Sequence, residues 1–222
     1  MMPDSNSLFT GEAQPSIETL AEGVTLLRAF CREEAPALLD AIATVVADSR
    51  FRNMVVPSGH TMSVAMTNCG DLGWITDRTG YRYTAHDPLT GKPWPPMPAP
   101  LLHLAQRAAA TAAFPRFTPN ACLINRYAPG TRLSLHQDKN EQDYTHPIVS
   151  VSLGLPATFL LGTLRRTDTP RRIRIEHGDT LVWGGPARLI YHGVAPIAAS
   201  THPLTGPFRI NLTFRRVATK LS

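Results

Sequence analysis

Two histidines and one aspartate are the residues of this chain whose types and spacing most directly indicate metal chemistry. His136 and Asp138 lie two positions apart, and His192 follows 54 residues after the aspartate. In a strand, residues two apart point to the same side, so the first two side chains would present an imidazole nitrogen and a carboxylate oxygen together. Two imidazoles and one carboxylate bind Fe(II) on one face and leave the other coordination positions open. The pattern therefore predicts an iron enzyme that activates oxygen.

A polar segment near the C-terminus predicts a co-substrate beside that metal. Residues 209–215 alternate polar and apolar side chains, with Arg209 and Arg215 on the polar face, and Asn125 and Tyr127 alternate in the same manner. Arginine on an inward strand face is costly unless an anion is bound there, and bidentate pairing with a carboxylate solves the problem. We therefore expect a 2-oxoacid with two carboxylates as co-substrate. A solvated strand face is the alternative interpretation of the two arginines.

A second His-x-Asp triplet, His177-Gly178-Asp179, is interpreted as structural. Its glycine and aspartate are typical of a tight turn before an apolar strand, and a turn does not place both side chains on one face. The remaining histidines are expected on surface loops and helices: His60, His86, His103, His146 and His202.

The N-terminal half predicts two strands and two helices around an irregular flap. Strands are expected at 24–30 and 61–67. Residues 33–48 carry apolar side chains at helical spacing, and residues 98–113 are rich in Ala and Leu, so both segments predict helices. Segment 68–98 contains many Gly, Pro, Trp and Tyr residues, which favours an irregular or hairpin-like flap.

From residue 121 onward, short strand-like segments are separated by turn residues, which is typical of a sandwich or jelly roll. The expected strands are 121–127, 132–137, 147–155, 157–161, 172–176, 179–183, 187–191 and 208–216. The fold class is therefore mainly β with some α-helix. We divide the chain into a loose N-terminal arm (1–22), an N-terminal extension (23–120) and a β core (121–222), within one compact catalytic domain.

Composition and charge limit the class of protein. The 222 residues suit one large domain, and the net charge of +5 fits a nucleic-acid partner without requiring one. Three cysteines without C-x-x-C spacing predict no disulfide framework or zinc knuckle and favour a reducing compartment. The sequence shows no secretory signal and no apolar run of bilayer length. We expect a cytoplasmic, monomeric protein without a membrane partner.

The sequence resembles the AlkB family of Fe(II)- and 2-oxoglutarate-dependent dioxygenases, of the bacterial DNA alkylation-repair type. The resemblance covers nearly the whole chain. It is carried by the metal triad, by the two C-terminal arginines, and by the segments 62–70, 123–130, 133–139, 183–185 and 211–215.

The resemblance implies a double-stranded β-helix, or jelly-roll, core with flanking N-terminal helices and a nucleotide-recognition lid within 23–120. It also implies oxidative demethylation of alkylated bases, such as N1-methyladenine and N3-methylcytosine, in single- or double-stranded DNA and also in RNA. Fe(II) would be the metal, and 2-oxoglutarate and O2 the co-substrates. Formaldehyde, succinate and CO2 would be released, and the damaged base would be repaired by direct reversal.

The same resemblance assigns individual roles by position. His136, Asp138 and His192 are expected to bind iron. For 2-oxoglutarate, the expected contacts to the distal carboxylate are Arg209, Tyr127 and Asn211, and those to the proximal carboxylate are Arg215 and Asn125. For the base, Trp74 and His136 would form a sandwich, and the other expected contacts are Tyr81, Tyr83, Arg166, Met66 and Leu133.

Two positions depart from the bacterial repair pattern. Asn140 stands where such members often carry an acid near the base pocket, and His60 replaces an aromatic residue of the lid. Both positions bear on base preference. Neither touches the iron or the co-substrate chemistry.

Several alternatives stay open from the sequence. The same chemistry would also suit tRNA, a protein side chain or a small metabolite, and a nucleic-acid-binding module would need no turnover. A Zn or Mn cupin would leave Arg209 and Arg215 without a purpose. Five further arginines form either a solvated hairpin or a grip on phosphates through salt-sensitive contacts: Arg165, Arg166, Arg171, Arg172 and Arg174.

Overall fold

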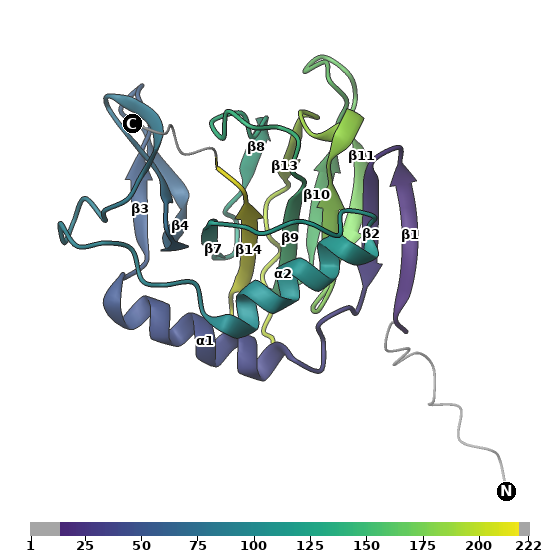
Figure 1. Ribbon diagram of the computed structural model, residues 1–222, viewed down its shortest axis with the longest axis horizontal. Coiled ribbons are helices and arrows are strands. Elements are labelled where there is room, and N and C mark those ends of the chain that lie inside the picture. Colours follow the sequence, from purple (N-terminus) through teal and green to yellow (C-terminus); the bar gives the residue numbers. More distant parts are fainter. Residues whose placement is uncertain (1–13, 218–222) are drawn as a thin grey trace, which may run out of the picture.

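Short runs of Val, Ile, Leu and Thr form the strands of two sheets that pack face to face (Figure 1). The computed structural model describes residues 14–217. The larger sheet has the order β1-β2-β12-β9-β14-β7-β4-β3. Its strands are β1 (Ser16–Ala21), β2 (Val24–Arg28), β3 (Arg52–Val55), β4 (Thr61–Gly70), β7 (Ala121–Tyr127), β9 (Ile148–Gly154), β12 (Thr180–Trp183) and β14 (Arg209–Arg215).

The smaller sheet covers the inner face of the larger one and has the order β11-β10-β13-β8. Its strands are β8 (Leu133–His136), β10 (Ala157–Leu161), β11 (Arg171–Ile175) and β13 (His192–Val194). A separate hairpin joins β5 (Gly73–Asp77) to β6 (Gly80–Thr84). This arrangement confirms the predicted mainly β fold with a jelly-roll core.

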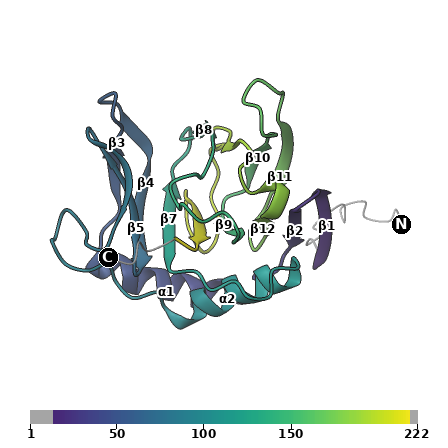
Figure 2. The ribbon, with the colours of Figure 1, turned by 45° about the horizontal axis from the view of Figure 1, so that its top comes forward.

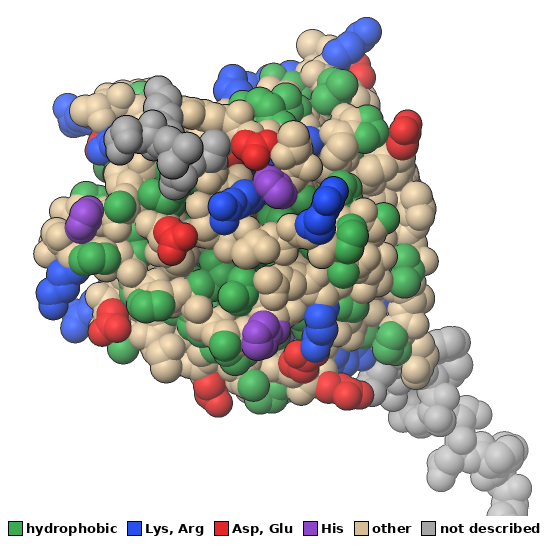
Figure 3. All heavy atoms as spheres, in the orientation of Figure 1, with side chains coloured by type: hydrophobic (Ala, Val, Ile, Leu, Met, Phe, Trp, Pro, Cys, Tyr) green, Lys and Arg blue, Asp and Glu red, His purple; other side chains and the backbone are tan. Residues whose placement is uncertain are grey.

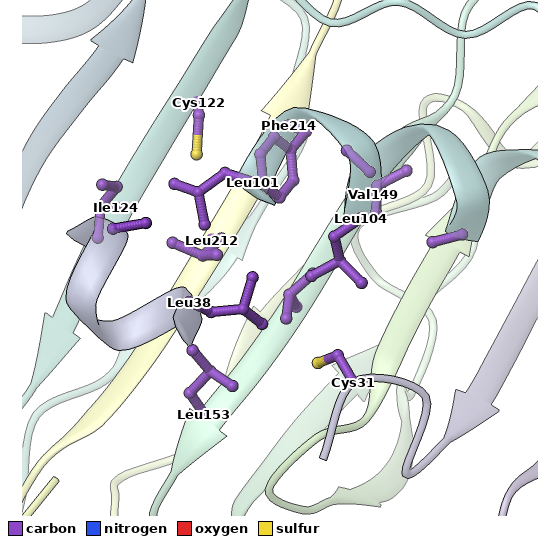
Figure 4. Packing of buried hydrophobic residues seen from close by; sticks show 14 of the residues in the cluster. Cys31, Leu38, Leu101, Leu104, Cys122, Ile124, Val149, Leu153, Leu212 and Phe214 are labelled. Atoms are coloured by element: carbon purple, nitrogen blue, oxygen red, sulfur yellow. The ribbon is translucent and has the colours of Figure 1, made fainter. Parts of the chain in front are cut away.

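Two helices cover the outer face of the larger sheet (Figure 2). They are α1 (Ala35–Asp48) and α2 (Ala99–Thr111), and each carries proline in its first turn, where a missing N–H costs nothing. Leu38 and Leu104 lie in a shared core against the sheet, where each fully buried leucine contributes about 1.5–3 kcal/mol (Figure 4). The helices therefore fix the sheet from behind and leave its inner face to the site.

Strand alternation decides which residues face that interior. On β14, Ile210, Leu212 and Phe214 pack in the helix-side core, while the residues between them face the smaller sheet. The same alternation holds on β7, where Cys122 and Ile124 lie in the helix-side core. The predicted division of segment 209–215 into an apolar and a cationic face is therefore confirmed.

Two predicted elements differ from the structure. The strand predicted at 187–191 is wrong, because a 3-10 turn, η1 (Gly185–Ala187), comes first and the strand begins only at His192. Pro186 has no N–H for a ladder, and the N–H groups of Ala187 and Arg188 donate within the turn. The predicted loose arm is also not loose throughout, because residues 16–21 form β1 and pair with β2. Residues 1–13 of that arm lie outside the described part.

The predicted flap at 68–98 contains the β5–β6 hairpin, as the sequence indicated. β4 and β7 pair along their length, so strands on both sides of residue 120 belong to one sheet. Asn68, near the end of β4, donates to the carbonyl of Trp74 at 3.0 Å and accepts from its N–H at 3.0 Å. These two bonds fix the start of the hairpin to the larger sheet.

Candidate active site

His136 and His192 meet because the smaller sheet places their strands side by side. They are directly opposite in the pairing of β8 with β13, and Asp138 follows β8 by two residues. The Nε2 of His136 lies 3.7 Å from one carboxylate oxygen of Asp138, and the Nε2 of His192 lies 3.7 Å from the other. All three ligand atoms lie within 4.8 Å of one another, and no other such group occurs in residues 14–217. The structure therefore brings the predicted triad together.

Backbone carbonyls orient both imidazoles. The Nδ1 of His136 lies 2.8 Å from the carbonyl of Ser134, and the Nδ1 of His192 lies 3.1 Å from that of Ile190. An N–H at each Nδ1 leaves the Nε2 lone pair free for a metal, which is the usual arrangement of ligating histidines. Burial, aided by the neighbouring His136, lowers the pKa of His192 to about 4, so this imidazole is neutral at pH 7.

Asp138 is held in its ionised form by an arginine. The guanidinium of Arg215 donates to Oδ2 of Asp138 from Nη2 at 2.7 Å and from Nε at 3.1 Å. Burial acts to raise the pKa of Asp138, but Arg215 and the two imidazoles bring it below its usual range. Two imidazoles and one carboxylate are the donor set of a non-haem Fe(II) site, so these residues fit that metal.

Arg209 is a buried cation with unused donors. It is 2% exposed, and its Nη2 donates to the hydroxyl of Ser152 at 2.9 Å. Its Nε and Nη1 are buried without a partner, and burial lowers its pKa. Its guanidinium lies 4.9 Å from the ring centroid of Tyr127. Because an unpaired buried N–H costs about 1–3 kcal/mol, this arrangement fits a carboxylate bound against the free edge of Arg209.

A hydrogen-bonded amide row extends from Arg209 along β14. Asn211 donates to the hydroxyl of Ser150 and to the carbonyl of Val151, both at 2.9 Å. Asn125, directly opposite on β7, donates to Asn211 at 3.2 Å, while its own Oδ1 is buried without a partner. The row is rigid and polar, which suits a small polar molecule between the arginine and the triad.

One cavity of about 630 Å³ joins these groups to the lid. Its lining includes every residue that the sequence singled out for iron, co-substrate or base, apart from Tyr83. Those lining residues are Met66, Trp74, Tyr81, Asn125, Tyr127, Leu133, His136, Asp138, Asn140, Arg166, His192, Arg209, Asn211 and Arg215. His60 is exposed in the turn between β3 and β4 and does not line the cavity.

Trp74 and Tyr81 present aromatic faces at the lid side of this cavity. Their rings stack at 5.8 Å between centroids with an interplanar angle of 26°, and Tyr81 is 49% exposed. The indole N–H of Trp74 donates to Oδ1 of Asn140 at 3.3 Å. Asn140 therefore helps to fix the plane of the indole, in addition to lining the cavity.

Tyr83 belongs to the β5–β6 hairpin, which forms the lid, and its hydroxyl contacts a buried carboxylate. It donates to Glu141 at 2.6 Å, and Glu141 is 1% exposed. Glu141 also accepts from Arg188 at 3.1 Å, and the Nε of Arg215 lies 3.5 Å away. Arg188 in turn donates to the backbone carbonyl of Asp138 at 2.8 Å. The lid hairpin is thereby linked through buried charges to the loop that carries the carboxylate of the triad.

Glu141 and Arg188 were not predicted from the sequence. Glu141 lies 58 residues from Tyr83 and 47 residues from Arg188, so no local pattern marks the contacts. The one available signal was an acid three residues after a candidate metal ligand.

The second triplet is structural, as expected. The N–H of Gly154 donates to Nδ1 of His177 at 3.0 Å, and the carboxylate of Asp179 accepts from the N–H of Ala29 at 2.9 Å and from Arg28 at 2.9 Å. Both side chains therefore anchor the turn and the neighbouring strands.

Comparison with known proteins defines the class. Residues 23–215 match the 2OG-Fe(II) oxygenase superfamily. The chain is 58% identical to the alpha-ketoglutarate-dependent dioxygenase AlkB of Salmonella typhimurium strain LT2, over 96% of this chain and 98% of that protein. It is 56% identical to AlkB of Escherichia coli K12, over 94% and 97%. A solved structure of OsALKBH1 matches with a TM-score of 0.78 at 28% identity, covering 90% of this chain and all of that one. The chain belongs to the AlkB family of 2OG-Fe(II) oxygenases.

Family membership confirms the predicted enzyme class and cofactors. The protein is a dioxygenase that depends on Fe(II), 2-oxoglutarate and O2. Neither helix within residues 14–217 is long and apolar enough to span a bilayer.

Proposed function

We propose that this enzyme removes N-methyl groups from alkylated bases, of the N1-methyladenine and N3-methylcytosine type, in DNA and also in RNA. The observation that carries the proposal is the continuity of one cavity from the His-Asp-His triad to the stacked aromatic rings of Trp74 and Tyr81. Relatives that act on nucleic acids support the substrate class. They include the tRNA demethylase abh1 of Schizosaccharomyces pombe at 31% identity and the nucleic acid dioxygenase ALKBH1 of mouse at 33%.

Each part of the triad and of β14 has a proposed role in binding. His136, Asp138 and His192 hold Fe(II), because their ligand atoms converge. Arg209 pairs with the distal carboxylate of 2-oxoglutarate through its two free donors, beside Tyr127 and Asn211. The proximal carboxylate lies near Asn125 and Arg215, and Arg215 also keeps the carboxylate of the triad ionised and oriented.

Bound together, Fe(II), 2-oxoglutarate and O2 supply the oxidation of an N-methyl group, with succinate, CO2 and formaldehyde as products beside the repaired base. The protein supplies orientation and a secluded pocket. Trp74 and His136 offer faces for stacking, Met66 and Leu133 add apolar lining, and Tyr81 and Arg166 contact the nucleotide. Tyr83 supports the lid through Glu141 instead of touching the base.

The damaged base must leave the duplex or already be single-stranded, because a methyl group on its pairing edge is hidden in paired DNA. Stacking on aromatic faces replaces the lost stacking at roughly 1–3 kcal/mol per base. A cationic methylated base also gains from the electron-rich indole of Trp74. The enzyme works as a cytoplasmic monomer in this proposal.

A paired-substrate assay tests the proposal. Purified enzyme with Fe(II), 2-oxoglutarate and air is given an N1-methyladenine oligonucleotide or its unmethylated twin, as DNA and as RNA, and formaldehyde and restored adenine are measured. We expect stoichiometric formaldehyde and adenine only from the methylated strands. Arg209→Met, which keeps the volume but removes the donors, should raise the KM for 2-oxoglutarate. Binding of methylated strands without any restored base would contradict the proposal and favour a non-catalytic binder.

A further inference from the structure

We propose that the hairpin formed by β10 and β11 carries a second nucleic-acid contact, a phosphate-binding surface outside the base pocket. We call this surface the β11 arginine ribbon, and it consists of Arg165, Arg172 and Arg174. It rests on the proposed function, because its ligand is the sugar-phosphate backbone that flanks the damaged nucleotide on the same strand.

The alternation of β11 turns two arginines away from the core. Ile175 is buried in the core between the sheets and Ile173 packs against it. Arg172 and Arg174 occupy the intervening positions and are exposed. They therefore project from the outer face of the smaller sheet, about 7 Å apart along the strand. Each can reach a different phosphate of an extended strand.

The ribbon is only weakly neutralised by its own acids. Arg165 lies 3.4 Å from Asp168 and Arg174 lies 2.7 Å from Glu176, and the two arginine side chains are 80% and 71% exposed. Pairs this exposed contribute about 0–1 kcal/mol, so a phosphate can replace the carboxylate at little cost. Arg172 has neither an ion pair nor a side-chain hydrogen bond within residues 14–217.

The ribbon is continuous with the base pocket. Arg166, in the loop that joins β10 to β11, lines the cavity and is exposed. Figure 2 shows this loop and the β3–β5 region standing on opposite sides of β8, which carries His136. In Figure 3, Lys and Arg side chains lie at the upper edge of the molecule, where Figure 1 places the loop. A strand whose base enters the cavity therefore leaves it beside the start of β11.

Two further cations of the cavity rim strengthen the choice of a polyanion. Arg132 and Lys139 line the mouth and are exposed, and neither pairs with a carboxylate within the described residues. Guanidinium groups in a row that starts at the mouth of the cavity can bind negative charges at regular intervals. The phosphates of a nucleic-acid backbone are spaced in this way. Arg171 alternates with the two ribbon arginines of β11 and lies on the same face of β11 as Ile173, and it donates to the carbonyl of Leu20 at 2.6 Å, which ties the start of β11 to β1.

Protection of a sheet edge is an alternative explanation for the exposed arginines of β11. β11 is an edge strand of the smaller sheet, and charged side chains on edges prevent pairing with other chains. Arg172→Glu with Arg174→Glu separates the two explanations, because glutamate keeps a charge on the edge but repels phosphate. The matched control is Arg50→Glu with Arg116→Glu. Both of these arginines are exposed beyond the ends of α1 and α2, and neither lines the cavity.

The experiment compares two methylated substrates, a single strand of about 15 nucleotides, which is within the usual site sizes, and a trinucleotide. For the ribbon variant we expect the KM for the long strand to rise roughly 3- to 10-fold, and the dependence of log KM on log salt to be shallower by about 1.4, at 0.7 per lost contact. Turnover of the trinucleotide and the kcat should match the wild type. The control variant, Arg50→Glu with Arg116→Glu, should match the wild type on both substrates.

The possible results separate the arginine ribbon from edge protection and from the proposed function. An unchanged KM and salt slope for the long strand in the ribbon variant would overturn the ribbon and leave edge protection as its explanation. Equal losses in the ribbon and control variants would also overturn it, because net charge alone would then explain them. Failure of the wild-type enzyme to act on either methylated substrate would instead refute the proposed function. Circular dichroism and gel filtration establish that both variants are folded and do not aggregate.

Discussion

Arg209 is the residue that most clearly separates this site from ordinary strand packing. A guanidinium that is 2% exposed, with two donors lacking partners, is unfavourable in the absence of an anion. Its neighbour Arg215 differs, because it is satisfied by Asp138 at 2.7 Å. Strand alternation places both arginines on one polar face, and the family resemblance assigns Arg209 to the distal and Arg215 to the proximal carboxylate. In the structure Arg215 pairs with Asp138, while Arg209 keeps two buried donors without a partner.

Residue-level prediction succeeded where the signal was local. The alternation in segment 209–215 follows from strand geometry. Asp138 lies two residues beyond the end of β8, so its approach to His136 depends on the loop and on Arg215, and not on strand alternation as expected. His192 lies 54 residues after Asp138, so its place beside the other two depended on the expected jelly roll, and the roles by position depended on the family resemblance.

Neither the local pattern nor the family resemblance pointed to Glu141 and Arg188. They form a buried ion pair at 3.1 Å although they lie 47 positions apart, and such a pair exists only in the folded chain.

Replacement of Trp74 tests the stacking role at this scale. Trp74→Ala should raise the KM for a methylated oligonucleotide roughly 5- to 150-fold, because a stacked base is worth about 1–3 kcal/mol. The Kd of 2-oxoglutarate, measured by anaerobic titration, should stay unchanged, since the hydrogen bonds of Trp74 go to Asn68 and Asn140 and not to Arg209. Trp74→Phe keeps an aromatic face and should recover most of the loss. Equal weakening of both ligands in Trp74→Ala would show that the indole is only structural.

At the scale of elements, the lid hairpin and the loop after β8 form one buried charge network. Tyr83 of β6 contacts Glu141, and Glu141 contacts Arg188 just beyond η1. Arg188 also donates to the carbonyl of His146 at 3.0 Å, which closes the loop. This network joins the hairpin to the loop, in addition to the packing of Ile75 and the bonds between Asn68 and Trp74.

Substitutions in that network should rank in a definite order. Glu141→Ala leaves a buried Arg188 without its carboxylate and should lower the free energy of unfolding by about 3–5 kcal/mol. Tyr83→Phe removes one hydrogen bond while the ion pair survives, so a loss of about 1 kcal/mol is expected. Urea denaturation of the apoprotein measures both. A Glu141→Ala variant no less stable than Tyr83→Phe would show that the ion pair does not hold the loop.

His177, in the turn between β11 and β12, should make the folded protein less stable in acid. Burial, together with nearby His202 and Arg32, lowers the pKa of His177 from 6.5 to about 4. Between these values the unfolded chain binds a proton that the folded chain rejects, so stability falls as pH drops from 6.5 toward 4. The Tm of the apoprotein should fall over that window, and His177→Gln should lessen the fall. His103→Gln, at an exposed position of α2, is the control, and an equal effect of the two substitutions would contradict this assignment.

Sequence patterns located most elements but not their neighbours in space. The apolar spacing of α1 and the short segments after residue 121 correspond to observed elements. The strand expected at 187–191 does not form, because the N–H groups of Ala187 and Arg188 donate within the 3-10 turn that contains Pro186. The pairing of β1 with β2 was missed, because an exposed edge strand carries few of the apolar residues that mark a strand.

At the scale of the whole molecule, the site exists only where the two sheets meet. The smaller sheet supplies the two histidines, and the larger supplies Arg209 and Asn125. Ligands that contact both sheets should therefore stabilise the complete fold. No local sequence pattern could show that meeting, because it depends on the order β12-β9-β14-β7 in one sheet and β10-β13-β8 in the other.

Ligand removal tests this linkage. Fe(II) with 2-oxoglutarate, added without air at about 100 times the Kd, should stabilise the protein by about 2.7 kcal/mol. For a chain of this size the Tm should rise by roughly 5–11 °C, at 2–4 °C per kcal/mol. A chelator should reverse the rise, and 2-oxoglutarate without metal should give a smaller one. An unchanged Tm with both ligands present would contradict a site built from the two sheets.

The central claim is that His136, Asp138 and His192 hold ferrous iron next to a 2-oxoacid. Its most direct test is the visible absorption spectrum of the anaerobic apoprotein after addition of Fe(II) and 2-oxoglutarate. The wild type should develop a metal-to-ligand charge-transfer band. Folded His136→Ala and His192→Ala should not develop it at the same concentrations. A band of wild-type intensity in either variant, or no band in folded wild-type protein, would contradict the claim.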